Sequence, residues 1–110
     1  MSAPFVSIVL PTRNGLATLP SVLDAIARQQ TDFSFEIVAV DSSSTDGTPD
    51  LLRSRVDRFI NIPVDAFDHG STRNLGIQQA GGELVVLLVQ DAVPSSESWL
   101  AALTAPLIGD

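Results

Sequence analysis

Several residue types are missing from this 110-residue sequence, and each absence excludes a class of function. There is no cysteine, so the chain has neither disulfide bonds nor thiolate chemistry. There is no lysine either: all six basic residues are arginines, and the formal net charge is −7. Because sequence-independent nucleic-acid binding needs a basic face, we expect no nucleic-acid partner.

Long hydrophobic runs are also absent. The longest apolar run, residues 84–89, is far shorter than the roughly 20 residues that a membrane-spanning helix needs. The opening MSAPFVSIVL has no charged segment before its apolar residues, which predicts a first strand rather than a signal peptide. We therefore expect no transmembrane segment and a cytoplasmic protein.

The residues that are present form an alternation of strand and helix patterns. Strands are predicted at 5–10, 35–40, 58–64 and 83–89, and helices are predicted in 18–30, 48–54, 71–80 and 95–107. Thr18, Thr48 and either Ser95 or Ser96 are the expected N-caps. Near-continuous apolar strands separated by helices are typical of a parallel sheet covered on both faces. Residues 1–110 are therefore predicted to be one α/β domain with a Rossmann-like, mostly parallel sheet.

In such sheets, ligands bind beyond the carboxyl ends of the strands. The segments that fall there are 11–15, 41–47, 64–70 and 90–94, and they hold much of the unusual polar chemistry of the chain. Arg73 is predicted in the first turn of the next helix, where it could hold a phosphate; an exposed surface arginine is the alternative. The single histidine, His69, is given no catalytic role, because a lone loop histidine is more often structural or solvated.

Two aspartates at strand ends each allow two interpretations. Asp41 could accept hydrogen bonds from a base or ribose, or belong to a turn, although turn chemistry needs it least in its segment. Asp91 ends a buried strand, where a carboxylate is costly unless it is solvated, paired or metal-bound. Magnesium or manganese takes one or two carboxylates together with phosphate oxygens. Capping of the following loop is the alternative for Asp91.

Two common nucleotide-binding motifs are missing from the sequence. No G-x-G-x-x-G follows the first strand, and no phosphate-binding GxxxxGK[ST] exists in a chain without lysine. Four segments instead match one family in the correct order: VSIVLPTRNGLATLPSVLDAIARQ, FEIVAVDSSSTDGT, TRNLGIQQAGGELVVLL and QDAVPSSESWLAAL. From about residue 5 to 107 the chain resembles the family 2 glycosyltransferases of the GT-A fold. Its QDA and DHGSTRN forms are most similar to the rhamnosyltransferase-type branch.

The resemblance implies a role for individual residues. Pro11 and Thr12 fall where the first loop of the family borders the nucleotide base, and Asp41 matches the acid that recognises the base or ribose. Arg73 matches the arginine of the R-N motif near the phosphates. Asp91 matches the last acid of the D-x-D motif, which binds divalent Mg or Mn, whereas the first acid is replaced by Val89. The implied nucleotide-sugar contacts are Pro11, Thr12, Asp41, Ser42, Arg73 and Gln90, with Asp91 as the metal ligand.

The resemblance also implies an activity. An inverting enzyme of this kind transfers a sugar from a nucleoside-diphosphate sugar, dTDP-rhamnose in the most similar branch, to a saccharide or lipid-linked acceptor in cell-surface polysaccharide synthesis. Family catalytic domains are roughly twice this size. We therefore expect a truncated donor-binding half that is inactive alone, with its catalytic base beyond residue 110. The full-length protein would be cytoplasmic or peripheral at the inner face of the membrane.

One alternative remains open at this point. The chain could be a non-catalytic α/β nucleotide-binding or assembly module that lacks the acceptor half. An exposed strand edge and exposed apolar surface would then favour self-association.

Overall fold

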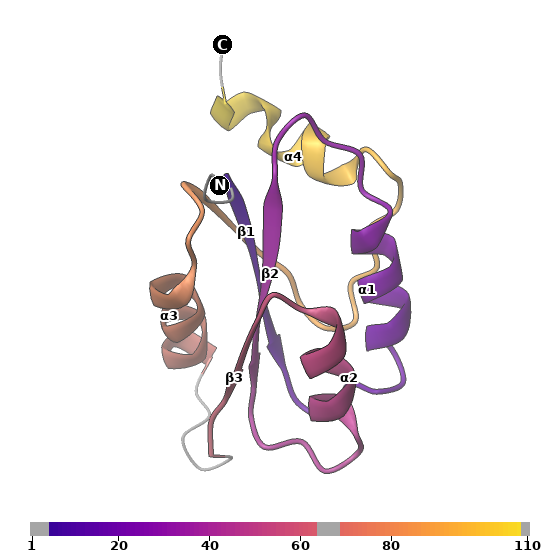
Figure 1. The fold of residues 1–110 in the computed structure, drawn as a ribbon, viewed down its shortest axis with the longest axis vertical. Helices are drawn as coiled ribbons and strands as arrows, with labels where there is room; N and C mark the ends of the chain where they lie inside the picture. Colours follow the sequence, from indigo (N-terminus) through magenta and orange to yellow (C-terminus); the bar gives the residue numbers. More distant parts are fainter. Residues whose placement is uncertain (1–4, 64–68, 109–110) are drawn as a thin grey trace.

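The computed structural model of the protein describes residues 5–63 and 69–108. Within these residues, strands and helices alternate along the chain (Figure 1). The elements are β1 (Val6–Thr12), α1 (Leu19–Ala27), β2 (Phe35–Asp41), α2 (Thr48–Arg55), β3 (Arg58–Asn61), α3 (His69–Gln79), β4 (Leu84–Leu87) and α4 (Trp99–Ile108). The predicted α/β succession is therefore confirmed.

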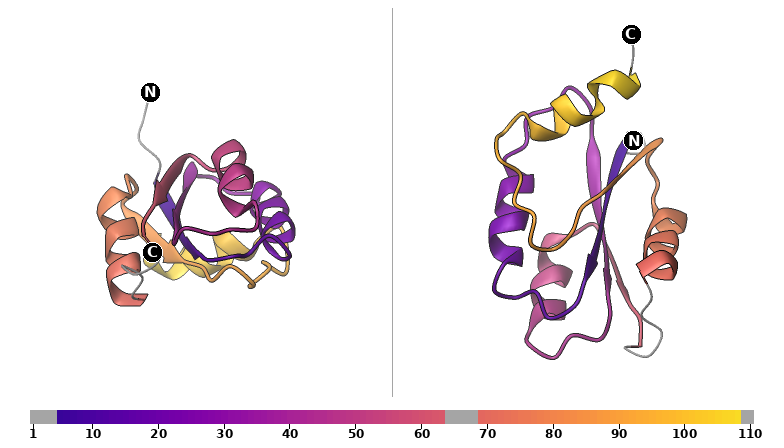
Figure 2. Two further views of the ribbon diagram at one scale, coloured as in Figure 1. Left: turned by 90° about the horizontal axis from the view of Figure 1, so that it is seen from below. Right: turned by 180° about the vertical axis from the view of Figure 1, so that it is seen from behind.

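The strands form one parallel sheet in the order β3-β2-β1-β4. β1 and β2 lie in the centre and pair over seven residues, whereas β3 and β4 are shorter edge strands of four residues. Helices α1 and α2 lie on one face of the sheet and α3 lies on the other (Figure 2). The predicted parallel sheet with helices on both faces is confirmed.

The core fills the space between the sheet and the helices. Helix α1 buries an apolar stripe at helical spacing, namely Leu19, Val22, Leu23 and Ile26. On the opposite face, α3 lies close to the sheet at Gly76, where a Cβ atom would come within 2.4 Å of Val9 Cγ1. α3 packs against β1 and β2, so it leaves the outer face of β4 uncovered. Val85 and Leu87 on that face are accordingly 37% and 46% exposed.

The ends of the helices differ from the predictions. α2 begins at Thr48 after Gly47, whose φ of 94° puts it in the left-handed region, so Thr48 is not the N-cap. Thr18 does precede α1, but its hydroxyl does not bond to the helix. α3 begins at His69, two residues before the predicted start, which places Arg73 in the second turn rather than the first.

Helix α4 begins at Trp99 instead of at the predicted caps, Ser95 or Ser96. The cause is tertiary: Ser96 O accepts a hydrogen bond of 2.6 Å from Gln29 Nε2, and Glu97 O accepts one of 2.8 Å from Gln30 N–H. These carbonyls are therefore bonded to the residues that follow α1, and the carbonyl of Ser96 also accepts a 3.3 Å hydrogen bond from the N–H of Trp99, where α4 begins. α4 itself lies at the end of the molecule where the strands begin (Figure 1).

The strand ends also differ from the predictions: β1 runs through Pro11 to Thr12 and β2 runs to Asp41, beyond their predicted ends at residues 10 and 40. β4 ends at Leu87, two residues early, and β3 is described over Arg58–Asn61. The predicted end of β3 at residue 64, and most of the 64–70 segment, lie outside the described residues. None of the helices within 5–63 and 69–108 is long and apolar enough to cross a bilayer.

Candidate functional site

A pocket of about 410 Å³ lies beside the carboxyl ends of β1 and β4. Its volume is in the range typical of small-molecule sites. The lining residues are Pro11, Thr12, Arg13, Arg73, Leu87, Leu88, Val89, Gln90 and Asp91. Five predicted site residues are thus brought together from three separate parts of the chain. Asp41 and Ser42 are not among the lining residues.

Pro11 explains why a pocket opens here. The N–H of Leu88 donates to the carbonyl of Val9 at 3.0 Å, the last backbone bond between this part of β1 and the β4 segment. In a parallel ladder the donors toward one neighbour come from alternate residues, so the next bond would need the N–H of residue 11. Proline has no N–H. β1 therefore stays paired with β2 as far as Thr12, whereas its pairing with the β4 segment ends earlier and the two segments separate.

The side chain of Gln90 reconnects the two segments beyond this gap. The N–H of Arg13 donates to Gln90 Oε1 at 2.8 Å, and Gln90 Nε2 donates to the carbonyl of Arg13 at 3.0 Å. The backbone carbonyl of Gln90 also accepts a 3.0 Å hydrogen bond from the hydroxyl of Thr18. The carboxamide predicted to contact the nucleotide is therefore bonded to protein backbone.

Asp41 is fully buried as the last residue of β2, where the turn begins. Its Oδ1 accepts hydrogen bonds from the hydroxyls of Thr12 and Ser44, at 2.5 and 2.6 Å, and its Oδ2 accepts one of 2.9 Å from the N–H of Ser44. The expectation that turn chemistry needs Asp41 least is wrong, because this carboxylate organises the turn. It reaches the pocket only through Thr12, which it orients.

Sequence reasoning missed Arg13, which lines the pocket and ties the first loop to the second. Arg13 Nη1 donates to the carbonyls of Ser42 and Ser43, at 2.6 and 3.1 Å. The carbonyl of Ser42 is thereby engaged, and its N–H donates to the carbonyl of Thr12 at 3.1 Å. A signal was available: Arg13 is one of only six cations in the chain and lies between a strand-ending Pro-Thr and an Asn-Gly turn.

Further hydrogen bonds join the loops at 13–18 and 42–48. The N–H of Asn14 donates to Ser44 Oγ at 2.7 Å, and Asn14 Oδ1 accepts from the N–H of Thr45 at 2.8 Å. Asn14 and Ser43 both have positive φ, 48° and 52°. Asp46 accepts from the N–H of Leu16, and the hydroxyl of Thr48 is the main cause that lowers the pKa of Asp46. The hydroxyl-rich second loop is thus largely engaged with the first loop.

The charges at the pocket suit an anion. Its lining carries two guanidinium groups, Arg13 and Arg73, and one carboxylate, Asp91, in a chain whose net charge is −7. Arg73 projects from the second turn of α3, one turn after the helix N-terminus, where backbone N–H groups favour negative charge. Among the lining residues, positive charge therefore exceeds negative charge by one.

Asp91 is exposed in the turn that follows β4, closed by a 3.1 Å bond from the N–H of Ala92 to the carbonyl of Val89. Val89, at the other D-x-D position, is 56% exposed and has no ligand atom in its side chain. No group of three or more metal-ligating side chains occurs in the part of the chain that the structure describes. A single exposed carboxylate still fits a divalent ion whose other ligands are phosphate oxygens and water.

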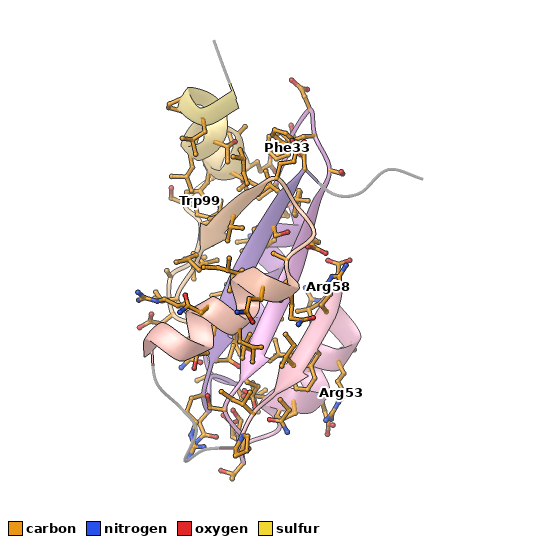
Figure 3. All side chains as sticks on the ribbon, turned by 90° about the vertical axis from the view of Figure 1, so that its left-hand side faces the viewer. Phe33, Arg53, Arg58 and Trp99 are labelled. Atoms are coloured by element: carbon orange, nitrogen blue, oxygen red, sulfur yellow. The ribbon has the colours of Figure 1, made fainter. Side chains whose placement is uncertain are left out.

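A second pocket, of about 540 Å³, lies near α4 at the opposite end of the sheet. It is lined by Phe5, Asp32, Phe33, Ala101 and Ala105, and Figure 3 labels Phe33 at this end. It is larger than the first pocket but contains none of the predicted site residues and no cation. His69 begins α3, and its side chain lies outside the described part of the molecule.

Comparisons with known proteins agree with this geometry. The family described as Glycosyl transferase family 2 matches residues 7–110. The O-antigen chain rhamnosyltransferase RfbN of Salmonella typhimurium is 36% identical over 90 residues, which cover 80% of this chain and 28% of that protein. The chain therefore spans about a third or less of the length of such relatives.

Two solved structures share the fold. TarS 1–349 of S. aureus in complex with UDP-GlcNAc superposes with a TM-score of 0.78 and 28% identity, covering 92% of this chain and 30% of that one. The mannosyltransferase PcManGT of Pyrobaculum calidifontis, in complex with GDP-Man and Mn²⁺, has a TM-score of 0.74 and 28% identity. That match covers 88% of this chain and 30% of the other.

Proposed function

The chain belongs to glycosyl transferase family 2, and from that premise we propose that the pocket beside β1 and β4 binds the diphosphate of a nucleoside-diphosphate sugar. The observation that carries the proposal is the convergence of Arg13, Arg73 and Asp91 on one pocket from distant parts of the sequence. Two guanidinium groups can hold phosphate oxygens in a bidentate manner.

Four of the lining residues have a proposed contact with the ligand. Pro11 and Thr12 form the wall beside the base, and Arg73 contacts the phosphates. Asp91 would hold magnesium or manganese on the diphosphate, and the metal would neutralise the negative charge of the leaving group. Asp41 and Ser42 act on the nucleotide through Thr12 and Arg13, to which they are bonded.

The reaction of the whole enzyme would be an inverting displacement. An acceptor hydroxyl oxygen attacks the anomeric carbon as the bond from that carbon to the diphosphate oxygen breaks, and a base takes the hydroxyl proton. We assign no base among the described residues. The similarity to a rhamnosyltransferase supports dTDP-rhamnose as donor and a role in cell-surface polysaccharide synthesis. We expect no transfer from the 110-residue chain alone.

A second candidate function, a non-catalytic assembly module, is favoured by one observation. The outer face of β4 exposes Val85 and Leu87, and the strand forms an edge of the sheet. Such an edge favours association with another chain or with a second copy. Glycosyl transfer or donor hydrolysis by the 110-residue chain would contradict this second candidate.

Calorimetry with UDP and dTDP tests the proposed site. We expect binding in the presence of Mn²⁺, and we expect Asp91→Ala to weaken it about tenfold, because a charged ligand to the metal is lost. In EDTA the two proteins should bind alike. The matched control is Asp32→Ala, which removes an aspartate from the other pocket. Absence of binding at millimolar nucleotide, or equal loss in the control, would contradict the site.

A further inference from the structure

Gln90 lies where the two sides of the pocket are joined. Backbone pairing between this part of β1 and the β4 segment stops at the bond from Leu88 N–H to the carbonyl of Val9. Beyond that bond, and within the described part of the chain, the hydrogen bonds that join residues 10–18 to the segment after β4 all involve Gln90. One residue therefore sets how far the first loop lies from the turn that carries Asp91.

The carboxamide of Gln90 replaces a missing strand partner. It accepts from the N–H of Arg13 and donates to the carbonyl of the same residue, as a neighbouring strand would. The first loop is shaped for this contact, because a Cβ atom at Gly15 would lie 2.6 Å from Gln90 Oε1. The hydroxyl of Thr18 holds the backbone of Gln90 from outside the pocket lining.

We propose that Gln90 is a positioning residue of the donor site and not a contact for the nucleotide. Its carboxamide keeps the first loop and the Asp91 turn at a fixed separation, so that the pocket exists before a ligand arrives. A preformed site loses less conformational entropy on binding and therefore binds more tightly. Arg13 extends this frame to the second loop through the carbonyls of Ser42 and Ser43. The proposal rests on the proposed function in that the ligand is a nucleoside diphosphate.

Hydrogen exchange in the ligand-free protein tests the frame itself. In Gln90→Met, which keeps the length of the side chain but makes no hydrogen bond to Arg13, the amide of Arg13 should exchange about tenfold faster. The amide of Leu10, inside the β1–β2 pairing, should be unchanged and serves as the internal reference. Gln78→Met, at an exposed position of α3, is the control variant.

Measurements of nucleotide affinity then test whether Gln90 positions the first loop or contacts the nucleotide itself. Gln90→Met should weaken binding of UDP or dTDP about tenfold, and Thr18→Val should weaken it about threefold although Thr18 does not line the pocket. If Gln90 instead contacted the nucleotide directly, Gln90→Met would weaken binding while exchange at the amide of Arg13 stayed as in the wild type. Thr31→Val is the matched control, because its hydroxyl also donates to a backbone carbonyl, that of Phe33, away from the pocket.

The outcomes are distinct. Faster exchange at Arg13 together with weaker binding by both Gln90→Met and Thr18→Val supports the proposal. Unchanged exchange at Arg13, or wild-type affinity in Thr18→Val, overturns it. If Gln90→Met does not fold, Thr18→Val supplies both measurements. If the wild type binds no nucleoside diphosphate, the proposed function fails, while exchange at Arg13 still decides whether Gln90 forms the frame.

Discussion

Replacing Glu36 with leucine is expected to lower the free energy of unfolding by about 3 kcal/mol, because several hydrogen-bond donors lose their shared acceptor. Glu36 is 6% exposed at the amino end of β2. Its Oε2 accepts from the hydroxyl of Ser7 at 2.5 Å and from the N–H of Gly81 at 2.7 Å, and its Oε1 accepts from Arg58 Nε at 3.1 Å. The loss should appear in chemical denaturation at neutral pH.

The carboxylate of Glu36 stabilises the fold because it links several elements. It joins β1, β2 and β3 to the turn between α3 and β4, and Figure 3 labels Arg58 on the β3 side of the sheet. The N–H of Gly82 completes the cluster by donating to Ser7 Oγ at 2.8 Å. A Cβ atom at Gly82 would lie 2.8 Å from Ser7 N, so the turn needs glycine there.

The effect of Glu36 should depend on pH. Burial is the largest single influence and raises its pKa, but the hydrogen bonds from Ser7, Gly81 and Arg58, with the charge of Arg58, together lower the pKa below its ordinary value. A lowered pKa in the folded state means that the stabilisation is complete above about pH 4.3, the ordinary value, and is lost as pH falls through the folded-state pKa.

The control for Glu36→Leu is Glu83→Leu, the same change at an exposed position, which should alter stability by no more than about 0.5 kcal/mol. The difference in unfolding free energy between wild type and Glu36→Leu should shrink on acidification from neutral pH. A difference that stays constant down to pH values well below the ordinary glutamate pKa, or an equal loss in Glu83→Leu, would contradict the assigned cause.

Asp41→Asn is expected to lower the free energy of unfolding by about 2 kcal/mol and to weaken nucleotide binding as well. The two carboxylate oxygens accept from the hydroxyls of Thr12 and Ser44 and from the N–H of Ser44. An amide has one acceptor oxygen and places a donor where the other oxygen was, so at least one of these buried donors loses its partner. The turn loosens, and Thr12 at the pocket wall loses its orientation.

Two measurements check this prediction. Denaturation should show the loss of stability, and calorimetry should show weaker binding of UDP and dTDP by a similar factor, because the effect is on the loop and not on a contact to the base. Asp57→Asn is the control, since the carboxylate of Asp57 also accepts from a backbone N–H, that of Ile37, away from the pocket. Selective loss of one nucleotide with full stability would instead indicate direct base recognition by Asp41.

Local patterns in the sequence were sufficient to predict the main elements of the fold. The spacing of Leu19, Val22, Leu23 and Ile26 predicts α1, and the apolar runs predict strands buried on both faces, as β1 and β2 are. The longest run, residues 84–89, instead falls on edge strand β4, where Val85 and Leu87 are exposed. The start of α4 could not be predicted in this way. The carbonyls of Ser96 and Glu97, just before α4, are bonded to Gln29 and Gln30, which lie nearly 70 residues earlier in the chain, so the start of the helix depends on tertiary contacts.

The candidate site was also only partly predictable, because local patterns place residues near the site but do not determine their tertiary contacts. The rule that ligands bind at the carboxyl ends of parallel strands places Pro11, Arg73 and Asp91 at one edge, and all three line the pocket. Whether a polar side chain in these loops faces a ligand or another loop is decided by tertiary hydrogen bonds. Asp41 and Gln90 are both engaged with the protein, and Arg13 joins two loops, and these partners lie too far away in the sequence for residue type and spacing to indicate them.

The most direct test of the central claim is a titration of the ¹⁵N-labelled protein with UDP or dTDP and Mg²⁺, followed by amide chemical shifts. If the pocket beside β1 and β4 binds the diphosphate, the largest shifts will fall on Thr12, Arg13, Gln90 and Asp91. Shifts confined to Phe33, Ala101 and Ala105 in the other pocket, or no shifts at millimolar nucleotide, would contradict the account.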